Sequence, residues 1–158
     1  MKNTFKRSGA ALISLVLLLV LAVSAGAASS QNVGVKFWKE RSDKESMANS
    51  GIDSNRTATL TRQANGTYTL TLPVMQVSKL GVTGYLSGLT IGDVTYDGTL
   101  TGDFNKATAV LTIKNLPASV LTGSDSSKAL AVTCSIKMDT ILLGDISTSA
   151  KMSIWVER

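Results

Sequence analysis

Residues 130–138, LAVTCSIKM, carry the clearest secondary-structure signal in the chain. Apolar residues occupy every second position of this stretch: Leu130, Val132, Cys134, Ile136 and Met138. A period of two over nine residues predicts a β-strand with one buried face. A second alternating run, residues 148–157, follows the break at Gly144-Asp145. We expect these two strands to pair antiparallel and to close the fold.

The beginning of the chain has the pattern of a signal peptide. Basic residues precede an almost continuous apolar run, residues 10–23, and residues 25–27 (Ala-Gly-Ala) match the signal peptidase pattern. We expect residues 1–27 to be removed and residues 28–158 to form a single domain, exported and without a membrane span. The alternative, an uncleaved anchor, needs about 20 apolar residues, and this run is shorter.

The charge that remains after cleavage is small. The leader holds three basic residues and no acidic residue, so the net charge of +5 falls to +2 for residues 28–158. The remaining Lys and Arg residues are scattered along the chain. Because proteins that bind nucleic acid gather such residues into a patch, we expect no nucleic-acid partner.

The chain contains no histidine and one cysteine, Cys134. The absence of histidine removes the Ser-His and Cys-His catalytic pairs, the usual zinc ligands and the commonest haem ligand. We therefore expect any metal to be held through oxygen or sulfur, and separately we expect a protein that is not an enzyme. A single cysteine forms no intramolecular disulfide, and its place on the buried face of residues 130–138 predicts core packing.

Short alternating runs predict further strands elsewhere. Asn65-Gly66 predicts a type I′ hairpin turn, and Asp97-Gly98 predicts another hairpin turn. Residues 81–92 contain four glycines, which predicts a short, bent strand. The pattern as a whole predicts an all-β, immunoglobulin-like antiparallel β-sandwich of seven or eight strands. Its remaining strands are expected at residues 33–38, 58–62, 67–74, 94–96 and 109–113.

A long polar connection, residues 39–55, separates the first two of these strands. Asp43 or Ser46 is expected to cap a short helical turn near Met47. Connections of this length are often binding loops. Methionine alone is an ordinary core residue, but if this loop folds over the strand that ends at Met138, two thioethers face each other across a slot.

Residues 33–157 resemble a NEAT domain, the haem-binding immunoglobulin-like module of Gram-positive cell surfaces. The resemblance rests on four segments: Val35-x-Phe37-Trp38, Lys44-Glu45-Ser46-Met47-Ala48-Asn49, Ala58-Thr59-Leu60 and Gly66-Thr67-Tyr68-Thr69-Leu70. It implies a haem cofactor covered on one face by the loop. Typical haem-binding members also carry Tyr-x-x-x-Tyr on the last strand, and residues 148–155 lack it.

The resemblance also implies a set of site residues. Because some NEAT-like haem receptors use methionine on iron, the expected metal ligands are Met47 and Met138. Ser46 and Lys44 are expected near the haem propionates. The apolar walls are expected to come from some of the residues Tyr85, Leu86, Ile136, Met152 and Ile154.

The implied function is a secreted or surface haem-binding or haem-transfer protein of iron acquisition. Its partners would be haem and either host haemoproteins or another surface haem receptor. One alternative is a structural or adhesive immunoglobulin-like module that binds a protein or glycan without a cofactor. Another is a Cu(I) site built from methionines.

Overall fold

The computed structural model describes residues 28–79, 81–139 and 144–158. The predicted signal peptide lies outside these residues. No helix in the described part of the chain is both long enough and apolar enough to cross a membrane. The strands are β1 (Ser29–Lys39), β2 (Ala58–Arg62), β3 (Tyr68–Pro73), β4 (Val77–Lys79), β5 (Val82–Ile91), β6 (Val94–Thr101), β7 (Val110–Leu116), β8 (Leu130–Met138) and β9 (Ile146–Val156). The helices are short 3-10 turns, η1 (Met47–Gly51), η2 (Ala118–Val120) and η3 (Ser126–Lys128).

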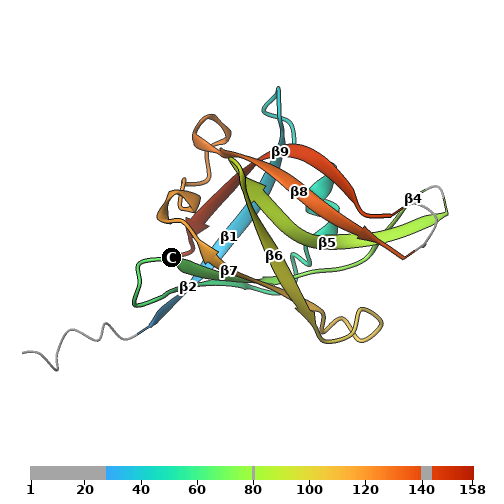
Figure 1. The fold of residues 1–158 in the computed structure, drawn as a ribbon, viewed down its shortest axis with the longest axis horizontal. Coiled ribbons are helices and arrows are strands. Elements are labelled where there is room, and N and C mark those ends of the chain that lie inside the picture. The colour runs from blue at the N-terminus through green and yellow to red at the C-terminus, as the bar shows by residue number, and fades with distance from the viewer. Residues whose placement is uncertain (1–27, 80, 140–143) are drawn as a thin grey trace, which may run out of the picture.

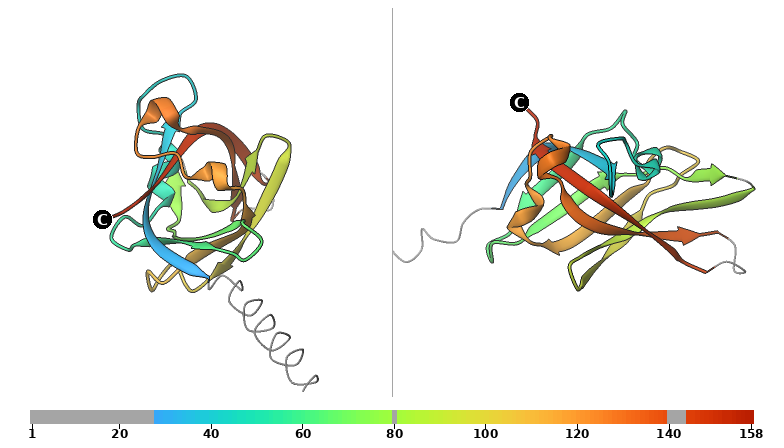
Figure 2. Two further views of the ribbon diagram at one scale, coloured as in Figure 1. Left: turned by 90° about the vertical axis from the view of Figure 1, so that its left-hand side faces the viewer. Right: turned by 90° about the horizontal axis from the view of Figure 1, so that it is seen from above.

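The strands form a closed antiparallel barrel. Pairing runs in the order β5-β6-β7-β3-β2-β1-β9-β8, and β8 pairs back with β5 to complete a ring of eight strands. The short strand β4 pairs with β5 outside the ring and projects from one end of the barrel (Figure 1). Seen end-on, the ribbons surround a single core (Figure 2).

The all-β prediction is confirmed, but the pairing is that of one continuous sheet with nine strands in the described residues, not of a two-sheet sandwich. Alternation specifies which face of a strand is buried, and that face is inward in a sandwich and in a barrel alike. The β5–β8 pairing that closes the ring is long-range and leaves no local mark in the sequence.

The predicted strand 130–138 is β8, with the same bounds. It pairs antiparallel with β9, from Leu130 opposite Met152 to Ile136 opposite Ile146. Cys134 is fully buried in the core, as predicted, and this burial raises the pKa of its thiol to about 12. Residues 130–138 therefore form one strand of the barrel wall.

The predicted hairpin at Asn65-Gly66 is present, with a different turn. Gln63 and Thr67 are joined by a hydrogen bond, and the amide of Gly66 donates to the carbonyl of Gln63. Gly66 has a φ of 82°, whereas Asn65 is not among the described non-glycine residues with positive φ. A type I turn followed by one left-handed residue fits this geometry, so the type I′ prediction is wrong.

The predicted turn at Asp97-Gly98 is also wrong, because β6 runs through both residues. Gly98 pairs with Ile113 of β7, and a Cβ atom there would stand 2.8 Å from Cγ of Leu111. The glycine therefore permits close packing inside the barrel wall. The chain turns instead at Gly92, where φ is 59°. Strand β5 spans ten residues, longer than predicted, and its pairing with β8 shifts register between Leu86 and Gly88.

Inward-facing side chains from seven of the eight strands of the ring are buried in the core, and β6 contributes the partly buried Tyr96 and Leu100. The largest side chains that are almost completely buried are Phe37, Leu60, Leu70, Leu72, Leu89, Leu111, Ile113, Leu116, Met152, Ile154, Val33 and Val74. Among the charged residues that the structure describes, only Asp53 is buried.

The connection between β1 and β2 carries η1, which begins at Met47. The Ser46 side chain caps it by accepting a hydrogen bond from the amide of Ala48 at 3.3 Å. The predicted capped turn near Met47 is therefore present, with Ser46 as the cap and 3-10 geometry. Figure 2 shows this segment against the barrel wall.

Candidate functional site

An apolar groove of about 410 Å³ lies between η1 and the β4 end of the barrel. This volume is within the range of small-molecule sites, about 300–1,000 Å³. The residues that line it are Ser46, Met47, Ala48, Gly51, Val77, Val82, Gly84, Tyr85, Leu86, Ile136, Met138, Ile146 and Thr148. The connection after β1 thus forms one side of the groove, and β4, β5, β8 and β9 form the other.

The groove brings together six of the residues singled out in the sequence. They are Ser46, Met47, Tyr85, Leu86, Ile136 and Met138. The two methionines come from different sides, Met47 from the first position of η1 and Met138 from the last position of β8. Methionines far apart in the chain thus share one groove.

Three other residues lie elsewhere. Lys44 is exposed in the loop before η1 and is not among the lining residues. Met152 and Ile154 are completely buried in the core, farther along β9 than the two residues of that strand that line the groove, Ile146 and Thr148. The alternation of apolar and polar residues identified the inward face of β9 correctly. It does not specify which inward-facing residues along the strand line the groove.

Sequence reasoning also missed part of the lining. Val77 and Val82 flank the β4–β5 turn, and Ile146 begins β9. Ile146 is 46% exposed where it lines the groove. Nothing local in the sequence distinguishes these residues from ordinary strand residues, because they meet only after the barrel has closed.

The thioether of Met138 is held tightly against β5. Met138 pairs with Gly84, and its sulfur lies 2.8 Å from the position that a Cβ atom on Gly84 would occupy. Real Cβ atoms do not approach sulfur so closely, so only glycine leaves room for this side-chain position. Met47, by contrast, is 58% exposed at the mouth of the groove.

The donor set of the groove is neutral. Of the described residues that line it, none is charged, and the polar groups are the hydroxyls of Ser46, Tyr85 and Thr148. The part of the chain that the structure describes also contains no cluster of His, Cys, Asp and Glu suited to a metal ion. Thioether sulfur favours soft metals and low oxidation states, so the groove suits an apolar ligand with a soft, neutral metal contact.

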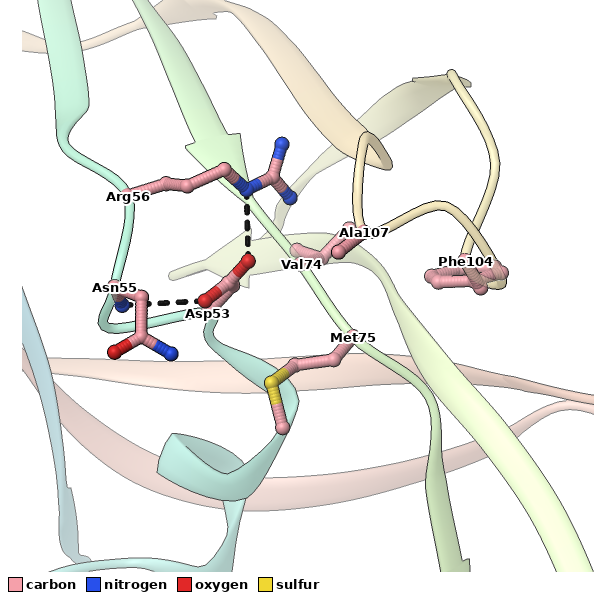
Figure 3. A pocket seen from close by; sticks show the side chains of 7 residues that line it. All are labelled: Asp53, Asn55, Arg56, Val74, Met75, Phe104 and Ala107. Carbon is pink, nitrogen blue, oxygen red and sulfur yellow. Dashed lines mark hydrogen bonds and ion pairs between the residues drawn. The ribbon is translucent and has the colours of Figure 1, made fainter.

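A second groove, of about 390 Å³, lies where the chain leaves η1 (Figure 3). Its main polar feature is an ion pair in which Nε of Arg56 lies 2.7 Å from the carboxylate of Asp53. Arg56 also donates to the carbonyl of Ala109 at 2.5 Å. The hydrogen bond from Arg56 is the largest of the influences that hold the pKa of Asp53 below its ordinary value of 3.8.

These contacts are internal to the fold. The hydrogen bond from Arg56 to the carbonyl of Ala109 ties the segment after η1 to the residue before β7, and the amide of Asp53 donates to the carbonyl of Pro73. Met75 and Phe104 form the apolar side of this second groove (Figure 3). We therefore assign this groove a structural role, and the groove beside Met138 is the candidate ligand site.

Comparison with known proteins gives similarity in structure alone. No model of a known protein family matches the chain, and no curated protein sequence matches it either. The structure is similar to that of the NEAT5 domain of IsdX2, a B. anthracis haemophore, in complex with haem, with a TM-score of 0.51 and 11% identity over 84% of this chain and 99% of that one. It is also similar to a point mutant of IsdX2 NEAT5 in complex with haem, with a TM-score of 0.54 and 12% identity over 84% of this chain and 98% of that one. The described chain therefore has the fold of a NEAT domain.

Proposed function

We propose that this chain binds haem in the groove between η1 and β8, and that it serves as a secreted or cell-surface haem-binding or haem-transfer protein. One observation carries the proposal: Met47 and Met138 enter the same apolar groove from different elements. If haem were bound in this groove, Met47 and Met138 would hold its iron through neutral thioether sulfur.

The chemistry of the lining supports a porphyrin as the ligand. A porphyrin has wide apolar faces, and the walls formed by Leu86, Ile136 and Val82 would remove those faces from water. Its propionates are charged and belong at the mouth of a groove that has no charged lining. Ser46 at the start of η1 is placed to donate a hydrogen bond there, and Lys44 is exposed two residues earlier.

The similar solved structures support the same ligand. Both are NEAT5 domains of IsdX2 in complex with haem. This chain has no tyrosine on β9, so its iron contact differs from the tyrosine pair of typical haem-binding NEAT domains. Tyr85 of β5 is the one tyrosine among the described lining residues. It is the main competitor of the two methionines for iron, and the test must separate them.

Haem would come from host haemoproteins or be exchanged with another surface haem receptor. Export through the predicted signal peptide, residues 1–27, would place residues 28–158 outside the cell, where such partners occur. The polar groups among the described lining residues are hydroxyls, and we propose a binding role and no enzymatic one for this groove.

The test is a titration of purified residues 28–158 with haemin, followed by absorbance spectroscopy before and after reduction with dithionite. We expect a shifted Soret band that saturates at one haem per chain and a low-spin, six-coordinate ferrous spectrum. Tyr85→Phe should leave both unchanged. A spectrum that loses a tyrosinate charge-transfer band in Tyr85→Phe would assign the iron to Tyr85. The absence of any Soret shift in the parent protein would favour the cofactor-free adhesive module.

A further inference from the structure

The side chain of Asn49, in the middle of η1, pairs with the backbone of β1. Its Oδ1 atom accepts a hydrogen bond from the amide of Phe37 at 2.8 Å, and its Nδ2 atom donates to the carbonyl of Phe37 at 2.7 Å. One amide side chain therefore satisfies both backbone groups of a strand residue, as a neighbouring strand would.

No strand of the described residues pairs with these two backbone groups on that edge, which carries an isolated bridge between Trp38 and Glu45. Strand β2 pairs with β1 only from Ser29 to Val33, and β9 occupies the opposite edge. Because buried backbone groups need a partner, the edge beyond Val33 must be covered by other means. Asn49 covers it at Phe37, whose side chain is completely buried in the core. The amide of Ser46 also donates to the carbonyl of Phe37 at 2.9 Å.

The turn itself has little internal support. Within it, the amide of Asn49 donates to the carbonyl of Ser46 at 3.2 Å, and the amide of Ile52 donates to the carbonyl of Asn49 at 3.0 Å. A 3-10 segment of five residues is too short to hold its conformation alone. Its place depends on the contacts that its ends and side chains make with the barrel.

The other end of η1 is also held. The amide of Met75 donates to the carbonyl of Gly51 at 3.0 Å, and Ile52 forms a bridge with Val74. Asn49 is thus the side-chain contact between two backbone anchors, and it lies two residues from Met47. The part of η1 that carries Met47 is fixed relative to β1, and β1 is fixed relative to the barrel.

We infer that Asn49 is the positioning residue for the η1 side of the groove. This inference rests on the proposed haem function. The paired hydrogen bonds to Phe37 set the backbone of η1, so that Met47 faces the groove before any ligand arrives. A donor that is already in place loses less conformational entropy on binding than a donor on a free loop.

The experiment compares Asn49→Ala with Met47→Ala and with their double mutant. Asn49→Ala should weaken haemin binding roughly 10-fold to 100-fold, the range for residues that orient a metal ligand. It should also convert the six-coordinate spectrum into the spectrum of Met47→Ala, and the double mutant should bind no more weakly than Met47→Ala alone. Ser50→Ala, an exposed change on the same turn, is the matched control and should match the parent. Parent-like spectra in Asn49→Ala, or additive losses in the double mutant, would overturn the inference.

A second measurement needs no haem. In the ligand-free protein, Asn49→Ala should speed hydrogen exchange at the amides of Phe37 and Ile52 and leave the amide of Leu70, in β3, protected. Unchanged exchange at Phe37 would overturn the positioning role even in a protein that binds haem. If the parent binds no haemin while exchange at Phe37 does change, the haem proposal fails and the anchoring of η1 by Asn49 stands.

Discussion

The sulfur of Met138 lies directly over Gly84 in the neighbouring strand, 2.8 Å from where a Cβ atom on that glycine would stand. The same Cβ position is 2.9 Å from the carbonyl oxygen of Lys137, a backbone atom that cannot swing aside. The place of the thioether is therefore set by the absence of a side chain on β5.

Gly84→Ala should displace Met138 and disturb the groove. We expect a loss of stability of about 1–3 kcal/mol from overpacking, together with a fall in haemin affinity of roughly tenfold or more, equivalent to at least about 1.4 kcal/mol. Gly88→Ala is the matched control, because a Cβ atom there would stand 2.8 Å from the carbonyl oxygen of Tyr96, away from the groove. Both variants should have a lower melting temperature than the parent, but only Gly84→Ala should change the haem spectrum. Equal spectra in the two variants would contradict the role given to Met138.

Met138 should contribute more to haemin affinity than Met47. Met138 ends a strand of the barrel and is partly buried, whereas Met47 is 58% exposed. We expect Met138→Ala to abolish most haemin binding and Met47→Ala to weaken it less. Because neutral sulfur stabilises Fe(II) relative to tyrosinate, the parent should have a higher reduction potential than tyrosinate-ligated NEAT domains, and Met47→Ala, which should still bind haem, should lower it. Potentiometric titration of the haem-loaded proteins measures this.

Met75→Ala is the control for the methionine pair. Met75 is also exposed, at 43%, but it lines the second groove beside Asp53 (Figure 3). Its removal should leave haem affinity and spectrum unchanged. If Met47→Ala and Met138→Ala both behave like Met75→Ala, thioether ligation is wrong.

Gly66 should be costly to replace. Its φ of 82° is in the left-handed region, and nothing lies within 4 Å of the place that a Cβ atom would take, so the cost of a substitution is backbone strain and not collision. Gly66→Val should lower the free energy of unfolding by about 1–3 kcal/mol. Chemical denaturation measures it, and Ala64→Val in the same turn is a control without the positive φ. Equal stability of Gly66→Val and the parent would show that the hairpin tolerates another turn.

The Asp53–Arg56 ion pair should make the free energy of unfolding depend on pH. The folded-state pKa of Asp53 lies below the unfolded value of about 3.8, so the ionised pair stabilises the fold above that value and the contribution is lost as the pH falls through the folded pKa. Asp53→Asn should cost about 1–3 kcal/mol at pH 7, because Arg56 is left without its charged partner. The difference between parent and variant should shrink below pH 4, measured by urea denaturation. A difference that is constant with pH would show that Asp53 contributes no charge effect.

The sequence was most informative where a pattern is local. Alternation located β8 to the residue, and side-chain chemistry predicted Asp43 or Ser46 as the cap, of which Ser46 is the cap in the structure. Dipeptide signals were less reliable. Asn65-Gly66 does mark a turn, yet Asp97-Gly98 lies inside β6, because glycine also permits close packing against Leu111. The two uses of glycine are indistinguishable until the neighbouring strand is known.

The groove was predicted only in part, for a related reason. Met47 and Met138 could be proposed together because the polar loop gives no packing reason for a methionine. Met152 and Ile154 were assigned to the wall because they share the inward face of β9 with its groove end, but they are buried deeper in the barrel. The position of the site along β9 depends on the register of β9 with β8 and β1, which alternation alone does not provide.

The pairing of β1 with β9 joins the first and last strands of the described chain, from Val33 opposite Val156 to Lys39 opposite Ala150. Neighbouring strands such as β2 and β3 can pair early, but the ring cannot close until β9 is available. Such long-range closure raises contact order and slows folding. If the chain is exported as proposed, the candidate groove would form only after the last strand has crossed the membrane.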